Sequence, residues 1–126
     1  MPWSIEYVEQ TKIIKTIYTE PITLEELKDA AQTNLMLAVE KQTGLFLADC
    51  SEFKLSGKVI DIYQLGLFLE GLSRKLDLPI KEAMIEPVNA NNVSRDLHFY
   101  ENVANNRMVY VRVFQEEELG IQWLLE

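Results

Sequence analysis

The feature that constrains this chain most is the regular alternation of strand-like and helix-like segments along its sequence. Short strand-like runs occupy residues 44–49, 79–86 and 108–114, and a segment with helical spacing precedes each of them. A strand, a helix and another strand in succession fold as a right-handed crossover with parallel strands. The sequence therefore predicts an α/β fold built on a mostly parallel sheet.

Two more strands are expected at the start of the chain. Residues 3–7 and 13–18 alternate with a period of two, which is typical of strands. Because a short polar loop, 9–11, separates the two runs in this interpretation, we expect an antiparallel hairpin with a three-residue loop. Pro21 is expected to end the second strand.

The first helix is predicted with defined ends. Thr23 and Glu26 form the Thr-x-x-Glu pattern of a capping box. Leucine and alanine side chains then recur at helical spacing up to about Gln42. Gly44 is expected to take the left-handed backbone conformation that commonly follows a helix.

Three further helices complete the prediction. Apolar stripes mark a second helix at about residues 59–76 and a third at about 93–104. Glutamates 116–118 suit the first turn of a last helix through its dipole, and Leu119 and Trp123 are expected to face the sheet. The predicted order is β-β-α-β-α-β-α-β-α, with one five-stranded, mostly parallel sheet, an N-terminal hairpin and four helices.

The composition favours a single globular domain over residues 1–126. Of the 126 residues, 48% are hydrophobic and 25% are charged, which is enough apolar side chain for one packed interior. Twenty acidic residues against 12 basic ones give a net charge of -8, which disfavours binding to nucleic acid and to anionic lipid heads. The sequence shows neither a secretory leader nor a membrane-spanning apolar run, so we expect a cytoplasmic location without membrane insertion.

Few residues could support chemistry. Cys50 is the single cysteine and His98 the single histidine, so a disulfide framework and the usual zinc sites are excluded by count. We expect Cys50 to be unreactive because its acidic neighbours raise the pKa of a thiol. Ser94 and Asp96 lie on the same predicted helix as His98 and cannot form a catalytic chain with it, so His98 is expected to be an ordinary helix side chain. The sequence therefore predicts no catalytic residue, no metal ligand and no cofactor.

Five short segments stand out beside the order of elements. They are Thr23-x-Glu25-Glu26-Leu27, Leu47-Ala48-Asp49, Glu101-x-Val103-x-Asn105-Asn106-Arg107, Val111-Arg112-Val113-Phe114 and Trp123-Leu124. Together they resemble the SpoIIAA-like branch of the STAS (sulphate transporter and anti-sigma factor antagonist) superfamily, over nearly the whole chain. The resemblance implies a small cytoplasmic domain that works by binding and that, in the anti-sigma antagonist members, is regulated by serine phosphorylation.

Two serines are candidate phosphorylation sites. The resemblance places the regulated serine in an Asp-Ser-Ser-Gly signature at the start of the helix after the third strand, and here the stretch 49–57 keeps only Ser56-Gly57 of it. Ser51 and Ser56 would lie at the carboxyl edge of the sheet, where ligands and modifications gather. Helix N–H groups would favour a phosphate there, and nearby carboxylates would oppose it. Ordinary loop serines are the alternative interpretation.

The second predicted helix carries more apolar surface than its core-facing stripe requires. The additional surface is formed by Ile60, Tyr63, Leu67, Gly71 and Arg74. A neighbouring part of the chain could cover these residues, and the other hypotheses are a protein partner, a second copy in a homodimer, or a small apolar ligand. Arg107, which follows the third helix, either caps that helix or contacts an anion.

The sequence thus favours a non-enzymatic regulatory or protein-interaction module. The alternative is a carrier or sensor of a small apolar or amphipathic ligand, held between the second helix and the sheet. Both hypotheses place the contact on the second helix or close to it.

Overall fold

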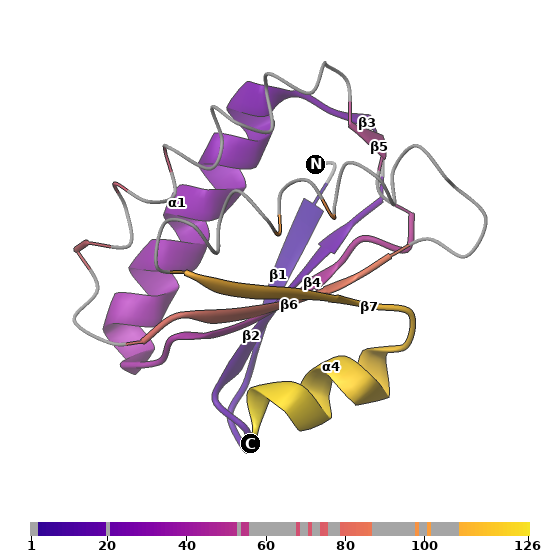
Figure 1. Cartoon of the computed structure of the whole chain (residues 1–126). Coiled ribbons are helices and arrows are strands. Elements are labelled where there is room, and N and C mark those ends of the chain that lie inside the picture. The colour runs from indigo at the N-terminus through magenta and orange to yellow at the C-terminus, as the bar shows by residue number, and fades with distance from the viewer. Residues whose placement is uncertain are drawn as a thin grey trace.

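The computed structural model of the chain describes residues 3–19, 21–52, 54–55, 68, 71, 74–75, 79–86, 98, 101 and 109–126, with the backbone alone at 21 and 54–55. Its elements, labelled in Figure 1, are β1 (Trp3–Val8), β2 (Ile13–Tyr18), β3 (Pro21–Ile22), α1 (Leu24–Lys41), β4 (Leu45–Asp49), β5 (Lys54–Leu55), β6 (Lys81–Ile85), β7 (Tyr110–Phe114) and α4 (Glu117–Leu124).

The main sheet has five strands in the order β1-β2-β4-β6-β7. Strands β1 and β2 pair antiparallel, and every other neighbouring pair is parallel. The α/β class, the five-stranded, mostly parallel sheet and the N-terminal hairpin are therefore confirmed. Because β2, β4, β6 and β7 run in the same direction, their carboxyl ends meet at one edge of the sheet.

The hairpin loop is one residue longer than predicted. Val8 pairs with Ile13, so the loop comprises the four residues 9–12. The amides of Thr11 and Lys12 both donate to the carbonyl of Val8, at 3.3 and 2.8 Å. Lys12 has a φ of 60°, and this left-handed conformation lets a four-residue loop close the hairpin. The three-residue prediction was wrong because a lysine gives no sequence signal for positive φ.

Helix α1 begins as predicted and ends differently. Thr23 and Glu26 form the full capping box, with reciprocal backbone-to-side-chain bonds of 3.0 and 3.2 Å. The left-handed residue after the helix is Gln42, with φ 54° and ψ 52°, and the expectation for Gly44 was wrong. Gly44 is needed for another reason: a Cβ at this position would overlap the carbonyl oxygen of Pro79.

A second, two-stranded sheet was not predicted. Strand β3 follows β2 and pairs parallel with β5, so Pro21 begins a short strand of its own. A proline fits the first residue of a strand because no amide donor is required there. Strands of two residues have no detectable period, which explains why the sequence pattern missed them.

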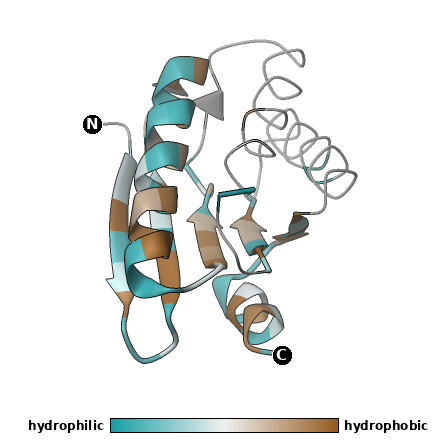
Figure 2. Cartoon of the chain, turned by 90° about the vertical axis from the view of Figure 1, so that its left-hand side faces the viewer, coloured by the Kyte–Doolittle hydropathy of each residue, from teal (hydrophilic) through white to brown (hydrophobic). Residues whose placement is uncertain are grey.

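The main sheet is covered on both faces. Figure 1 shows the sheet nearly edge-on with α1 above it and α4 below it, and in Figure 2 the upper turns of α1 are mostly hydrophilic while its lower turns carry more hydrophobic residues. On the α1 face, Ile14 and Ala38 form a fully buried pair. On the α4 face, Leu47 and Ala83 pack with Leu124. Strand β4 is buried on both faces, as its continuous apolar run predicted.

Helix α4 lies closer to the sheet than its sequence suggested. Gly120 is buried, and a Cβ there would lie 3.2 Å from the Cβ of Ala83. This close approach turns Leu119 outward, where it is 47% exposed, so the prediction that Leu119 faces the sheet was wrong. Trp123 is half-buried and packs on Phe114, with their ring centroids 5.8 Å apart.

Two lysines fasten α4 to the strands beneath it. The Lys15 ammonium lies 2.7 Å from the Glu117 carboxylate. That hydrogen bond raises the pKa of Lys15, and partial burial opposes the shift. The Lys81 ammonium donates to the carbonyl of Trp123 at 2.7 Å and lies 4.5 Å from the centroid of its ring. These contacts tie one end of α4 to β2 and the other to β6.

The predicted second and third helices, 59–76 and 93–104, lie outside the described residues except at six positions. The backbone is helical at Phe68, Gly71, His98 and Glu101, and it forms a turn at 74–75. In the described part of the chain, no helix is both long enough and apolar enough to cross a bilayer.

Candidate functional site

The carboxyl edge of the sheet carries the best-defined polar turn in the described structure. Strand β4 ends at Asp49, and the Cys50 amide then donates to the carbonyl of Ile85 at 2.9 Å. The Asp49 carboxylate accepts two hydrogen bonds from Ser51, from the amide at 3.1 Å and from the hydroxyl at 2.7 Å. The turn therefore leaves the sheet sharply and presents Ser51 to solvent.

The arrangement determines what Ser51 can do. Its hydroxyl is exposed, as a kinase substrate requires, and it serves as a donor to Asp49. A phosphate ester has no proton for that bond at neutral pH and adds negative charge beside a carboxylate. Modification of Ser51 would therefore open this turn and change the shape of the edge.

Cys50 lies beneath the turn and is fully buried. Burial raises the pKa of its thiol well above the ordinary value of 9.0, and the charges of Glu82 and Asp49 add to the shift. The thiol is therefore protonated at neutral pH and is a poor nucleophile, in agreement with the sequence-based expectation.

Tyr18, at the end of β2, is half-buried and packs against the same apolar cluster as Cys50. Burial raises the pKa of its hydroxyl well above 10.0, with further contributions from Cys50 and Glu82. Glu82 lies on β6 in register with Phe46 on one side and Val111 on the other, so its carboxylate belongs to the α1 face of the sheet. Glu82 is half-buried there.

A second polar cluster joins the ends of β6 and β7. His98 lies between two carboxylates, with Nε2 at 3.3 Å from Glu86 and Nδ1 at 3.6 Å from Glu101. The other oxygen of Glu101 accepts a hydrogen bond from the Val113 amide at 2.8 Å. The Tyr110 amide bonds to β6, so by alternation the Val113 amide points to the open edge of the sheet, where Glu101 covers it.

Sequence reasoning missed this cluster. The glutamates lie fifteen positions apart, and no local spacing connects them. The only available signal was topological, since Glu86 follows one parallel strand and Glu101 precedes the next. His98 itself is about half exposed, as expected of an ordinary helix side chain. Among the residues that the structure describes, no three side chains of His, Cys, Asp or Glu are arranged to hold a metal ion.

The other residues singled out from the sequence are only partly placed. Gly71 and Arg74 are exposed. Positions outside the described residues are Ser56, Ile60, Tyr63, Leu67 and Arg107. Of the predicted surface on the second helix, the structure therefore describes only Gly71 and Arg74.

Comparison with models of known protein families gave no match, and comparison with curated proteins gave none either. The SpoIIAA-like resemblance therefore depends on the residues quoted above and on the general kind of fold.

Proposed function

We propose that this chain is a non-enzymatic regulatory or protein-interaction module of the SpoIIAA-like (STAS) type, which binds a protein partner at the carboxyl edge of its sheet. One observation carries the proposal: at the edge where four parallel strands end, the turn after β4 presents Ser51 to solvent while the Asp49 carboxylate holds it in place. Ligands and modifications of open parallel sheets gather at this edge.

The segments that carry the family resemblance support this proposal through their structural roles. The segment that starts at Thr23 caps α1, and the segment that ends at Asp49 is the buried strand β4. Residues 111–114 belong to the edge strand β7. These three segments therefore have structural roles in the helix and strands of the sheet, and the segment 101–107 lies outside the described residues except at Glu101.

Ser51 is the control point in this proposal. Its hydroxyl and amide close the turn on Asp49, and Glu52 beside it is exposed. Phosphorylation would replace the bond to Asp49 by repulsion and release a partner that recognises the closed turn. Ser56 is a second candidate in the same segment of the chain.

A photo-crosslinking experiment tests the proposal. A photoreactive phenylalanine analogue at position 52, next to the turn, is compared with the same analogue at exposed position 32 on α1, in the cells from which the protein comes. We expect a crosslinked protein from position 52 that position 32 does not capture. That protein should bind the purified chain, keep its affinity for Ser51→Ala and lose it for Ser51→Asp.

Two outcomes would contradict the proposal. Identical crosslinks from positions 52 and 32 would show that the edge is not a specific surface. A captured protein that binds Ser51→Asp as well as the unmodified chain would remove Ser51 from the control of binding, and the regulatory part of the proposal would be wrong.

A second candidate function is carriage or sensing of a small amphipathic ligand between the second helix and the sheet. The observation that favours it is Glu82, which places a carboxylate between Phe46 and Val111 on the α1 face. Solvent extraction of protein purified from its own cells should then yield one small molecule in stoichiometric amount, and Glu82→Gln should lower that yield. Extracts without such a molecule would count against this function.

A further inference from the structure

We propose that the outer strand β7 and the adjoining flank of α4 form a surface on which a second copy of this chain docks. The inference extends the proposed binding function by naming one partner, and it concerns a different surface from the carboxyl edge. The surface consists of Tyr110, Arg112 and Phe114 on the strand and of Leu119 and Trp123 on the helix.

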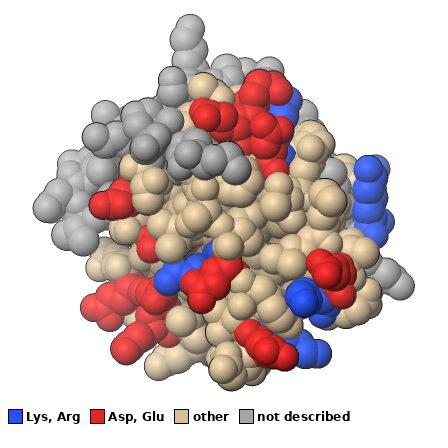
Figure 3. Space-filling model, turned by 180° about the vertical axis from the view of Figure 1, so that it is seen from behind, with Lys and Arg blue, Asp and Glu red and all other residues tan. Residues whose placement is uncertain are grey.

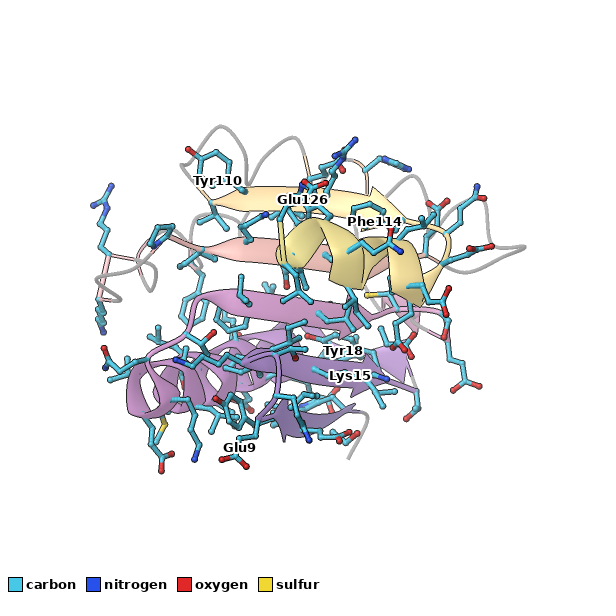
Figure 4. All side chains as sticks on the ribbon, turned by 90° about the horizontal axis from the view of Figure 1, so that it is seen from below. Glu9, Lys15, Tyr18, Tyr110, Phe114 and Glu126 are labelled. Carbon is cyan, nitrogen blue, oxygen red and sulfur yellow. The ribbon has the colours of Figure 1, made fainter. Side chains whose placement is uncertain are left out.

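The strand side of this surface is a row of large side chains on one face. Tyr110, Arg112 and Phe114 alternate along β7, so they point to the face that α4 covers. Tyr110 is 57% exposed, and the Arg112 guanidinium lies 5.7 Å from the centroid of the Phe114 ring. In Figure 4, Tyr110 lies at one end of β7 on the outer border of the sheet, and Phe114 lies at the other end of the strand, beside α4.

The helix side follows from how α4 is rotated. Gly120 faces the sheet, and Glu117 pairs with Lys15 on β2, so that flank of the helix faces β2. Leu119 and Trp123 are four residues apart and share the other flank. Trp123 packs on Phe114 of β7, and Leu119, one turn earlier on the same flank, points to solvent and extends the apolar row there.

The composition of this surface is that of a protein contact. Aromatic residues and arginine are enriched in interfaces and supply most of their hot spots. The open backbone edge of β7 is covered at Val113 by Glu101, which disfavours addition of a further strand there. A partner would therefore pack on the side chains and not on the strand edge.

Charge favours a second copy as the partner. The chain carries a net charge of -8, and its Asp and Glu side chains gather in several groups on the face seen in Figure 3, so most contacts between copies would be repulsive. This surface is an exception, because it carries charges of both signs: exposed Arg112 on β7, and exposed Glu126, whose amide donates to the carbonyl of Trp123 at 3.4 Å just after α4. Within the described part of the chain, neither residue forms an ion pair. A two-fold contact would place each Arg112 near Glu126 of the other copy.

Sedimentation velocity of the full chain over a range of concentrations tests the inference. We expect a monomer–dimer equilibrium that Tyr110→Glu and Leu119→Glu each weaken by about tenfold or more. The matched control is Met36→Glu on α1, which is 73% exposed on the opposite side of the sheet and should leave the dimerisation constant unchanged. Circular dichroism verifies that each variant is folded.

A charge exchange makes the test specific. Arg112→Glu and Glu126→Arg should each weaken the dimer, and the double variant should restore it, because the two-fold contact again pairs opposite charges. A wild-type chain that stays monomeric at its highest soluble concentration would overturn the inference, and so would a dimer that Tyr110→Glu leaves intact. Either result is independent of crosslinking at position 52, so failure of the dimer inference would not contradict the proposed function.

Discussion

Thr43 and Lys12 join two loops that are far apart in the sequence. The Thr43 hydroxyl donates to the carbonyl of Lys12 at 2.6 Å. The hydroxyl oxygen of Thr43 also accepts a hydrogen bond from the amide of Leu45, at 3.3 Å. Thr43 is buried, with an exposed fraction of 4%. One side chain therefore ties the loop after α1 to the hairpin loop and starts β4 in register with β2.

Thr43→Val tests the contribution of this bond. The substitution keeps the shape of the side chain and leaves the Lys12 carbonyl without its donor, so we expect a loss of about 1–3 kcal/mol in the free energy of unfolding. Urea denaturation measures the change. The control is Thr33→Val, which removes a comparable 3.0 Å bond to Asp29 on the exposed surface of α1 and should cost less than about 1 kcal/mol. Equal losses in the two variants would contradict the role of Thr43.

Lys12→Gly should stabilise the chain. Lys12 holds a φ of 60°, which is unfavourable for residues with a Cβ and costs glycine nothing. After the larger backbone entropy of glycine in the unfolded state is subtracted, we expect a gain of up to about 1 kcal/mol. The opposite result is expected for Gln32→Gly inside α1, which should lose about 1 kcal/mol. Thermal unfolding distinguishes the two, and a destabilised Lys12→Gly variant would argue against the four-residue loop.

Glycine-to-alanine substitutions should produce a graded series. At Gly44 a Cβ overlaps the Pro79 carbonyl, so we expect a loss of more than about 3 kcal/mol or failure to fold. At Gly120 the nearest atom is 3.2 Å away on a side chain, and we expect a loss of about 1–2 kcal/mol. Gly71 has no atom within 4 Å, so its alanine variant should match the wild type in urea denaturation. A different ranking would contradict the close approach of Gly44 to Pro79.

The elements that sequence could predict are those set by local patterns. Thr23 and Glu26 specify the start of α1 by themselves, and the apolar run that ends at Asp49 specifies a central strand. The rotation of α4 depended on Gly120 meeting Ala83, a contact between distant parts of the chain that the helical period does not encode. For this reason Leu119 was assigned to the wrong face.

The candidate site likewise has one part that a local pattern predicts and one part that depends on contacts between distant segments. Ser51 was predicted in the loop after β4 because the apolar run that ends at Asp49 is a local pattern that marks the end of the strand. The bonds of Ser51 to Asp49 also span only two residues. The contacts of His98 with Glu86 and Glu101 require β6 and β7 to be neighbours, which follows from topology and not from spacing. Their pairing could be seen only in the folded chain.

Glu101 should protect the open edge of β7. Glu101→Ala removes the acceptor of the Val113 amide. We expect hydrogen exchange of that amide to accelerate by about tenfold or more, since the amide is then no longer hydrogen-bonded to a side chain at the open edge of β7. Glu101→Gln keeps an oxygen acceptor and serves as the control, with exchange close to that of the wild type. NMR hydrogen exchange measures both variants. Fast exchange in the wild type would show that Glu101 does not cover the edge.

Stability should fall at alkaline pH because desolvation raises the pKa values of two weak acids, Cys50 and Tyr18. The folded-state pKa values of Cys50 and Tyr18 lie well above their ordinary values of 9.0 and 10.0, so their stabilisation is complete below those values. As pH rises further, the unfolded chain loses these protons first and becomes favoured. Urea denaturation between neutral pH and pH 10.0 should show a decline that Cys50→Ala makes shallower, and Tyr18→Phe should act mainly above pH 10.0. Lys15→Met is the contrasting variant, because the raised pKa of Lys15 affects stability only above 10.5. A wild-type stability that stays constant up to pH 10.0 would contradict the burial of the Cys50 thiol.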